Sequence, residues 1–507
     1  MREHLVVVIP GIGGSVLVDA AGQEVWSVRA NSLADLLRRP EQLSIEVNPE
    51  LTPRGLITSL KPLPMWTVIP GYEKVLRQLG RLEDAVVDDG TGPRNPAANV
   101  VAYGYDFRLG VEAAADRLDD FIRERLNLLW PIRPTQSEER RHHNRVLIIA
   151  HSMGGLVARH WAGRPENRSL CRAMMTLGTP HRGAPKALDV LVNGLPVAGG
   201  LGHISPKDTM RVVRQWQSVY DLLPRFPMVA AIDARLAGSA AQPDAQLLRP
   251  HELPADRLPS GWDSVRATRA HELHQRIKDW WERDMPSRER PEVVPRIGYG
   301  HGTPRRGTWD GRRLRITRGP FDGPSLGIWD ADRGDGTVPA ISGLPIELTN
   351  HVPVDLRQAL RHGPIGTLDT AADWANKYED YPRSLHVETG ESPDANRYPV
   401  VLGVDVEGLA VAGQPVPIAA RVLGVPEAVR EATRDAAVFA VVKPVGHAAP
   451  RQVVQLEWDA EAETFGGELS ATAPGLYAVT VSCDAIPGGG SPETTETTEV
   501  LADADLD

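Results

Sequence analysis

The hydrophobic residues of this chain form short continuous runs that alternate with stretches of helical spacing. Leu5–Ile9, Val146–Ile149 and Ala173–Leu177 are apolar runs, as is typical of strands that are buried on both faces of a parallel sheet. Gly71–Leu82 and Val111–Leu129 repeat apolar residues every three or four positions, which predicts two amphipathic helices. Strands and helices in this alternation predict a doubly wound, mostly parallel α/β sheet.

Two long stretches interrupt the alternation. Residues 20–70 are irregular and Pro-rich, which indicates an insertion because ordinary connections are much shorter. Residues 187–300 carry helical segments rich in Arg, Trp and Leu without clear strands. We therefore expect a helical cap over the sheet, inserted into a first domain that covers residues 1–380.

The last quarter of the chain has a different pattern. Residues 381–398 are rich in Pro, Ser and Asp, as expected of a linker. Residues 399–502 then contain about seven short alternating runs separated by turn residues, which predicts an immunoglobulin-like β-sandwich. This region shows no catalytic cluster, so it either binds a partner protein or braces the first domain.

Composition excludes several classes of protein. The chain has 507 residues, of which 41% are hydrophobic and 24% charged, as is usual for a globular protein of two or three domains. A net charge of -10 argues against a nucleic-acid-binding protein. One basic run is either a solvated face or a contact for phosphate or lipid headgroups: Arg305, Arg306, Arg312, Arg313 and Arg315.

Cysteine use and hydropathy bear on location. Cys171 and Cys483 lie in different predicted domains, so we expect a reducing compartment and no disulfide framework. No apolar stretch approaches the roughly 20 residues needed to span a bilayer, and the residues before Leu5 are too few for a signal peptide. We expect a cytoplasmic protein, and peripheral contact with a membrane is left open.

The most specific feature of the sequence is a serine between a predicted strand and a predicted helix. Ser152 follows the run that ends at Ala150 and precedes Gly154 and Gly155. A serine on a tight strand-to-helix turn needs very small neighbours at both flanks and presents its hydroxyl as a nucleophile. Ala150 stands where Gly is usual, and it is the next smallest residue. The alternative is an ordinary turn after a strand.

A glycine-rich loop, Pro10–Ser15, follows the first predicted strand. It lacks the glycine spacing and the lysine of known phosphate-binding loops. Acyl transfer requires two backbone amides directed at a developing oxyanion, one after the nucleophile and one from an early loop. Met153 and Ile12 are the residues expected to supply them.

A nucleophilic serine needs an imidazole base and a carboxylate that orients it, in the chain order Ser, acid, His for this arrangement. Asp335 lies in a Gly-rich loop and is the expected acid. Asp330 and Asp332 are its rivals, although they could equally serve in the loop or as helix caps.

His362 is the expected base. It lies in a Gly-Pro turn before a helix that should begin near Leu368, whereas its rival His351 follows a strand-like segment at Ile346–Leu348. His151 and His181 flank predicted catalytic segments, and we expect structural or pocket-lining roles for them because the base must come from a separate loop.

Five motifs occur in an order that resembles the lecithin:cholesterol acyltransferase-like branch of the α/β-hydrolases, which includes phospholipases and bacterial lipases. They are Pro-Gly-x-Gly-Gly from residue 10, Tyr-Asp-Phe-Arg at 105–108, Ala-His-Ser-Met-Gly-Gly at 150–155, Leu-Gly-Thr-Pro-His-Arg-Gly at 177–183 and Gly-Asp-Gly-Thr-Val at 334–338. The resemblance covers residues 5–380. Phe107 replaces the Trp usual in the second motif, and the early disulfide of the secreted acyltransferases has no counterpart before Cys171.

The resemblance implies an α/β-hydrolase fold with a triad of Ser152, Asp335 and His362. It also implies cleavage of an ester in a lipid or lipid-like acyl substrate. Trp66, His181 and Leu223 are expected to contact that substrate. The apolar residues of the cap either line the acyl pocket or form the cap's own core: Trp216, Leu222, Leu223, Phe226 and Met228.

The sequence therefore predicts a serine acyl hydrolase that acts through an acyl-enzyme, as a lipase, phospholipase or esterase. Transfer of the acyl group to an alcohol instead of water stays open. We expect no metal and no cofactor, a lipid or ester substrate, no nucleic acid, and a protein partner if the C-terminal domain is a binding module. The alternative is a non-catalytic binding or scaffold protein on a hydrolase fold.

Overall fold

The structure is a computed structural model, and its description covers most of the chain. The described residues are 2–27, 36–58, 71–131, 142–197, 202–231, 247–282, 290–310, 312–317, 334–348, 357–358, 362–365, 370–380, 401–423, 431–460, 462–470, 473–484 and 491–502.

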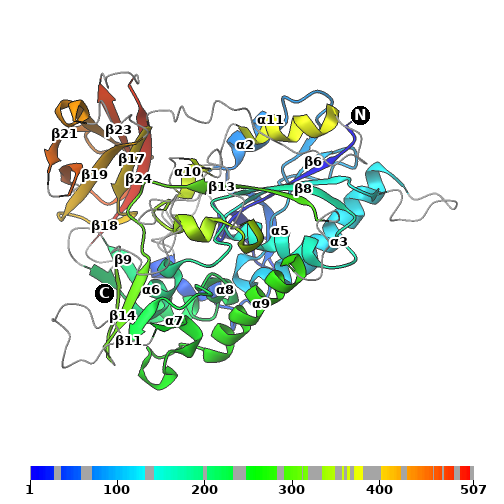
Figure 1. Ribbon diagram of the computed structural model, residues 1–507, viewed down its shortest axis with the longest axis horizontal. Coiled ribbons are helices and arrows are strands. Elements are labelled where there is room, and N and C mark those ends of the chain that lie inside the picture. Colours follow the sequence, from blue (N-terminus) through cyan, green and yellow to red (C-terminus); the bar gives the residue numbers. More distant parts are fainter. Residues whose placement is uncertain are drawn as a thin grey trace.

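A seven-stranded parallel sheet forms the centre of the first domain (Figure 1). Its strand order is β16-β13-β8-β7-β1-β6-β5, and each neighbouring pair is parallel. The strands are β1 Leu5–Ile9, β5 Val87–Asp88, β6 Val100–Ala102, β7 Val146–His151, β8 Cys171–Leu177, β13 Glu292–Gly298 and β16 Arg357–Gln358. The predicted doubly wound α/β fold is confirmed.

Helices cover both faces of this sheet. The α-helices are α2 Glu73–Leu79, α3 Val111–Leu129, α5 Met153–Gly163, α6 Pro185–Asn193, α7 Lys207–Val213, α8 Gln217–Asp221, α9 Ser264–Glu282, α10 His362–Ile365 and α11 Thr370–Lys377. In Figure 1, α2 and α11 lie on one side of the sheet and α3 and α5 on the other. The predicted helix at 111–129 has the bounds of α3.

Helix α5 is buried along its whole length because other helices cover it. Trp161 on α5 donates its indole N–H to Asp119 on α3 at 2.9 Å. Trp281 on α9 donates to the carbonyl of Arg159 on α5 at 3.0 Å. The helix that follows Ser152 is therefore held rigidly between the sheet, α3 and α9.

Strand register brings the predicted site loops to one edge of the sheet. β7 lies between β1 and β8, with Ile149 opposite Val8 on one side and Met175 on the other. The carboxyl ends of these three parallel strands therefore lie side by side at one edge of the sheet, where ligands bind in open α/β sheets. The loops that leave them begin at Pro10, Ser152 and Gly178.

The prediction that residues 187–300 lack strands is wrong. Four short strands lie there: β9 Leu195–Val197, β10 Gly202–Ile204, β11 Val229–Ala231 and β12 Leu247–Leu248. They pair in small sheets, the second of which also holds β14 Arg306–Trp309 and β15 Leu314–Thr317. Runs of two or three residues are too short to show an alternating pattern.

Strand β13 is a second correction, because it belongs to the central sheet rather than to the cap. Pro295 interrupts its apolar run, and a proline usually argues against an interior strand. In the described residues, β16 pairs only with Ile297 and Gly298. On the β16 side, Pro295 therefore has no neighbouring strand among the described residues. Its missing N–H is tolerated because this position lies at an edge of the described sheet.

The insertion at 20–70 is more regular than expected. Its described part contributes β3 Glu24–Trp26 and β4 Thr52–Leu56, which pair antiparallel with β2 Ser15–Val18 just before the insertion, and a 3₁₀ helix at Pro40–Leu43. Trp26 is buried and donates its indole N–H to the carbonyl of Gly13 at 2.7 Å. The insertion therefore packs directly on the glycine-rich loop.

Residues 401–502 form a separate antiparallel β region, called here the C-terminal β region (Figure 1, orange to red). Its strands are β17 Val401–Val406, β18 Leu409–Val411, β19 Pro415–Leu423, β20 Ala437–Val445, β21 Gln452–Asp459, β22 Thr464–Ser470, β23 Gly475–Asp484 and β24 Glu493–Leu501. The seven predicted runs all form strands, and β18 is an additional one, parallel to β24. The region has its own apolar core.

The immunoglobulin-like topology of this region stays a prediction. So do the domain boundaries, because the predicted linker at 381–398 lies outside the described residues.

Candidate active site

Ser152 occupies a strained turn between β7 and α5. Its φ is +52° and its ψ is -126°, a conformation that residues other than glycine rarely adopt. A Cβ atom on Gly154 would lie 2.5 Å from the carbonyl oxygen of Pro10, and one on Gly155 would overlap Thr179. The sequence Ser-x-Gly-Gly is therefore required by close packing against the ends of β1 and β8.

The structure brings Ser152, His362 and Asp335 together. Nε2 of His362 lies 2.7 Å from Oγ of Ser152, and Nδ1 of His362 lies 2.7 Å from Oδ2 of Asp335. All three residues are buried, with exposures of 1–2%. Because a carboxylate only accepts hydrogen bonds, Nδ1 carries the proton and Nε2 is free to accept one from the serine.

Backbone amides fix the carboxylate of Asp335. Oδ1 accepts hydrogen bonds from the amides of Thr337 at 2.9 Å and Val338 at 2.6 Å, which leaves Oδ2 for His362. The amide of His362 donates to the carbonyl of Asp335 at 3.0 Å. Asp335 and His362 are thus joined by one hydrogen bond between their side chains and one between their backbones.

Gly178, at the end of β8, makes room for this contact. Its φ is +58°, and a Cβ atom there would lie 3.2 Å from Oδ2 of Asp335 and 3.3 Å from Nδ1 of His362. A side chain at this position would press on the hydrogen bond between acid and base. This explains the glycine in the motif that starts at Leu177.

The glycine-rich loop runs against the serine. A Cβ atom on Gly11 would be 2.8 Å from Cβ of Ser152. Ile12 follows in the loop, and Met153 begins α5, so its amide has no acceptor in the preceding turn. In the described part of the chain neither amide donates to another protein group. Two free donors therefore flank the serine.

Tyr72 and His151 link the glycine-rich loop to His362. The Gly11 amide donates to the Tyr72 hydroxyl at 2.9 Å, the hydroxyl lies 2.8 Å from Nδ1 of His151, and Nε2 of His151 lies 2.8 Å from the carbonyl oxygen of His362. An amide can only donate and a carbonyl can only accept. Nε2 of His151 must therefore carry a proton, and when the ring is neutral Tyr72 donates to the unprotonated Nδ1.

Burial keeps both groups of this chain uncharged. It lowers the pKa of His151 to about 3, with the nearby His362 as a second cause, and it raises the pKa of Tyr72. His151 therefore does not compete with His362 as a base. The sequence predicts a structural or pocket-lining role for His151 but gives no signal for Tyr72, which is 79 positions away in the chain.

The other predicted residues have different surroundings. His181 is buried, with its ring nitrogens near Thr176 Oγ1 at 3.1 Å and Arg159 at 3.3 Å, so the ring is engaged within the protein. Leu223 is buried and its carbonyl packs on Gly183. Trp66, Asp330, Asp332 and His351 lie outside the described residues.

Two local predictions near His362 are wrong. His362 begins the short helix α10 instead of lying in a turn. The helix expected to begin near Leu368 is present as α11, which is described from Thr370. Ile346–Leu348 is a 3₁₀ helix instead of a strand. Its Glu347 forms an ion pair with Arg159 at 2.5 Å.

Trp216 belongs to the core of the cap. It is fully buried, donates its indole N–H to the carbonyl of Leu43 at 3.0 Å and contacts Phe107 edge to face. Leu222 and Met228 join the same hydrophobic core. Of the two alternatives, lining the acyl pocket or forming the cap's own core, the contacts of Trp216 therefore favour the second.

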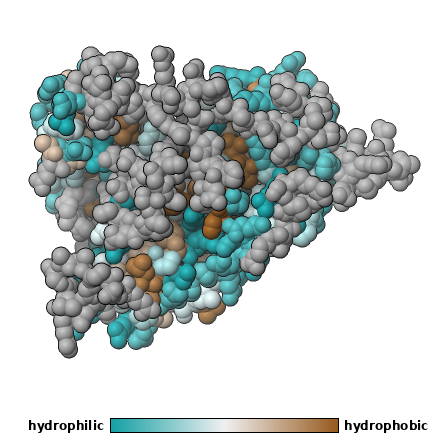
Figure 2. Space-filling model, in the orientation of Figure 1, coloured by the Kyte–Doolittle hydropathy of each residue, from teal (hydrophilic) through white to brown (hydrophobic). Residues whose placement is uncertain are grey.

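The basic run does not form one face. Arg305 is buried, whereas the amides of Arg312 and Arg313 donate to Asp310 in the exposed turn between β14 and β15. On the face shown in Figure 2, most of the residues that carry a hydropathy colour are hydrophilic, and hydrophobic ones appear chiefly near its middle.

A cavity of about 680 Å³ lies at the carboxyl ends of β5 and β6 rather than at Ser152. It is lined by Pro53, Gly55, Asp88, Gly90, Gly92, Arg94, Ala102, Tyr103, Gly104, Arg117, Asp120, Phe121, Glu124 and Arg125. Within the described residues, no group of three His, Cys, Asp or Glu side chains could hold a metal ion, and no helix is long and apolar enough to cross a membrane.

Comparison with known proteins agrees with this architecture. Residues 110–195 match the model of the PGAP1-like alpha/beta domain. That stretch runs from the start of α3 through β7, Ser152, α5 and β8 to the start of β9. The chain carries a hydrolase-type α/β core.

Two further similarities are more distant. The uncharacterized protein YJR098C of Saccharomyces cerevisiae is 28% identical over 186 residues, which are 36% of this chain and 24% of that protein. The chain thus spans about a quarter of the length of this relative. The crystal structure of the Tle4–Tli4 complex aligns over 74% of this chain and 97% of that chain, at 17% identity and a TM-score of 0.48.

Proposed function

We propose that this hydrolase core is a serine-dependent acyl hydrolase that cleaves carboxylic esters of lipid-like substrates through an acyl-enzyme. The observation that carries the proposal is the buried chain from Ser152 through His362 to Asp335, with two contacts of 2.7 Å. A nucleophile, a base and an orienting acid at these distances are what acyl transfer requires.

In the proposed reaction, Oγ of Ser152 attacks the ester carbonyl carbon while Nε2 of His362 takes its proton. The carbonyl oxygen becomes an oxyanion, and the amides of Ile12 and Met153 donate to it. When the bond to the leaving alcohol breaks, His362 returns the proton to the alcohol oxygen. The acyl group stays on Ser152.

Water completes the cycle. His362 takes a proton from the water as its oxygen attacks the acyl-enzyme, and returns this proton to Oγ of Ser152 as the carboxylic acid leaves. Asp335 holds the imidazole in the required tautomer and stabilises its charged form. An alcohol that enters in place of water would give acyl transfer.

Support for a lipid-like substrate comes from the five motifs, whose order resembles that of phospholipases and bacterial lipases. Substrate contacts of Trp66, His181 and Leu223, membrane association and a cytoplasmic location stay predictions of the sequence.

Reaction with a fluorophosphonate probe tests the proposal. The wild-type protein should be labelled, and Ser152→Ala should not. Ser218→Ala is the matched control, because Ser218 is a buried serine of α8 outside the site, and it should label like the wild type. A wild type that does not react would contradict the enzymatic proposal and favour a binding protein on a hydrolase fold.

The substrate class needs a second experiment. Rates on a series of p-nitrophenyl esters and on phospholipid vesicles should be compared below and above the concentration at which each substrate aggregates. A marked rise with aggregation and with acyl length is expected for a lipase or phospholipase. Highest rates on short, dispersed esters would instead indicate a soluble-ester esterase.

A further inference from the structure

We propose that the C-terminal β region positions the acid of the site, with His301 as the residue that connects them. The inference rests on the proposed function, since it assigns a role in the triad. It makes the region a part of the catalytic architecture rather than an appended module.

The loop that carries Asp335 is held by the segment 301–303. The amide of His301 donates to the carbonyl of Gly334 at 3.0 Å, and the amide of Gly334 donates back to the carbonyl of His301 at 3.3 Å. On the other side of Asp335, the amide of Gly336 donates to Oγ1 of Thr303 at 2.9 Å. Thr303 in turn donates to the carbonyl of His301 at 2.8 Å. The position of Asp335 therefore depends on the position of His301.

His301 is held by the C-terminal β region. Its side chain is buried, and Nδ1 lies 3.1 Å from the carbonyl oxygen of Val404 on β17. Because a carbonyl only accepts, Nδ1 carries a proton and donates it. A continuous set of hydrogen bonds thus runs from β17 to the Asp335 loop and on to His362.

Glycines on both sides allow the two backbones to approach. Gly300 has a φ of +90°, and a Cβ atom there would overlap the side chain of Leu423 on β19. A Cβ atom on Gly403 would lie 3.2 Å from the carbonyl oxygen of Gly300 and 3.5 Å from Cε1 of His301. Contact this close leaves no room for the segment to shift toward the C-terminal β region.

A second contact anchors the C-terminal β region to the hydrolase core. Leu409, Val411 and Leu501 are buried in the same hydrophobic cluster as the central sheet. The region also has an independent core of its own. It therefore contacts the hydrolase core at two places, at His301 and at this cluster, which is what is needed to hold a loop in position.

The decisive variant widens the contact between β17 and the His301 segment without changing Ser152, His362 or Asp335. Gly403→Leu places a side chain between β17 and the His301 segment, and should lower kcat about 10- to 100-fold because small displacements of catalytic groups have large effects. KM should change little. The matched control is Gly466→Leu, in β22 of the same region, where a Cβ atom would meet nothing within 4 Å; its kcat should stay within about twofold of wild type.

A double-mutant cycle separates positioning from general stability. His301→Ala should lower kcat, whereas His301→Asn should restore much of it, since the Asn amide can donate from nearly the same place as Nδ1. In an Asp335→Asn background, His301→Ala should have little further effect, because residues that act through one another are not additive. Thermal unfolding of every variant checks that the chain is folded.

Three outcomes would overturn the proposal. The first is equal kcat for folded Gly403→Leu and Gly466→Leu in an active protein. The second is an effect of His301→Ala that is unchanged by Asp335→Asn. The third is a wild type that neither turns over esters nor reacts with a fluorophosphonate, and this result alone would also reject the proposed function.

Discussion

A neutral chain of hydrogen bonds fixes the glycine-rich loop relative to the imidazole of the site. It runs from the Gly11 amide through Tyr72 and His151 to the carbonyl of His362, and each of its three bonds is 2.8–2.9 Å long. One end carries the proposed oxyanion donor at Ile12, and the other carries the proposed base. Single side chains that touch neither substrate nor serine are thus expected to influence catalysis.

Tyr72→Phe tests this chain. The ring keeps its packing, but the Gly11 amide and Nδ1 of His151 lose their partner, which typically costs about 1–3 kcal/mol for a buried group. We expect kcat for an ester substrate to fall about tenfold, with little change in KM.

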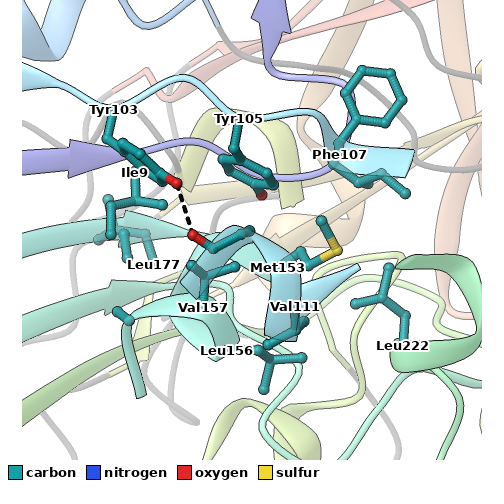
Figure 3. Packing of buried hydrophobic residues seen from close by; sticks show 14 of the residues in the cluster. Ile9, Tyr103, Tyr105, Phe107, Val111, Met153, Leu156, Val157, Leu177 and Leu222 are labelled. Carbon is teal, nitrogen blue, oxygen red and sulfur yellow. Dashed lines mark hydrogen bonds between the residues drawn. The ribbon is translucent and has the colours of Figure 1, made fainter. Parts of the chain in front are cut away.

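Tyr103→Phe is the control for that substitution. Tyr103 is also buried, and its hydroxyl donates to the carbonyl of Ala114 on α3 at 2.7 Å (Figure 3) instead of to the Gly11 amide or His151. Its kcat should stay within about twofold of wild type. Equal losses in the two variants would mean that Tyr72 acts only through stability.

At the scale of elements, the cap helix α8 and the long helix α3 meet at a buried carboxylate. Asp221 accepts hydrogen bonds from the Val111 amide at 2.8 Å and from Gln217 at 2.8 Å. Burial raises the pKa of Asp221 to about 6. The junction is therefore most stable when this carboxyl is protonated.

Asp221→Asn should remove a pH dependence of stability. Between about pH 4 and pH 6 the folded protein holds a proton on Asp221 that the unfolded chain has lost, so stability falls as the pH rises through this window. Asn keeps the bond to Val111, and the Gln217 amide can turn to accept from it. The variant should be about 1–3 kcal/mol more stable at pH 7, measured by urea unfolding from pH 4 to pH 8.

Asp263→Asn is the matched control, because Asp263 caps α9 in an exposed position and Asn caps helices equally well. Its unfolding midpoint should stay near that of the wild type. An Asp221→Asn protein that is less stable than wild type at pH 7 would show that the charged carboxylate is favoured at the start of α3.

Elements with long periodic patterns were predictable from the sequence, and short or interrupted ones were not. Helix α3 has 19 residues at helical spacing, and its predicted bounds match. Strand β13 was missed because Pro295 interrupts it, and β18 because it has three residues. The strands β9 to β12 owe their pairing to tertiary contacts that no local pattern carries.

The proximity of the three proposed site residues was predictable for a similar reason. Ser152, Asp335 and His362 lie in glycine-containing motifs whose spacing reflects tight turns, and the structure places them within hydrogen-bond distance. Tyr72 and His301 lie in no motif. Their positions follow from contacts between segments far apart in the chain, so only the folded arrangement reveals them.

At the scale of the whole molecule, several buried histidines make stability sensitive to acid. Burial lowers the pKa of His151 to about 3 and of His160 and His274 to about 4, and it lowers the pKa of His181 well below its usual range. In the unfolded chain these groups take up protons below about pH 6.5. Stability that is present at neutral pH is therefore lost as the pH falls.

We expect the free energy of unfolding to drop by a few kcal/mol between pH 7 and pH 5, since each such histidine contributes up to about 1.4 kcal/mol per pH unit. Asp221 opposes this trend, as does His203, whose pKa is raised by its hydrogen bond to Asp189. Thermal melts in buffers from pH 7 to pH 5 measure the effect. A midpoint that stays constant or rises toward pH 5 would contradict the assignment of these histidines as buried and neutral.

The central claim is that Ser152 carries the acyl group of an ester during turnover. The most direct measurement is rapid mixing of the protein with a p-nitrophenyl ester, followed by acid quench and peptide mass mapping. We expect a burst of one p-nitrophenol per protein and an acyl adduct on the peptide that contains Ser152, and we expect Ser152→Ala to abolish both. An adduct on another residue of the wild-type protein would contradict this claim. So would a Ser152→Ala protein that still turns over the ester.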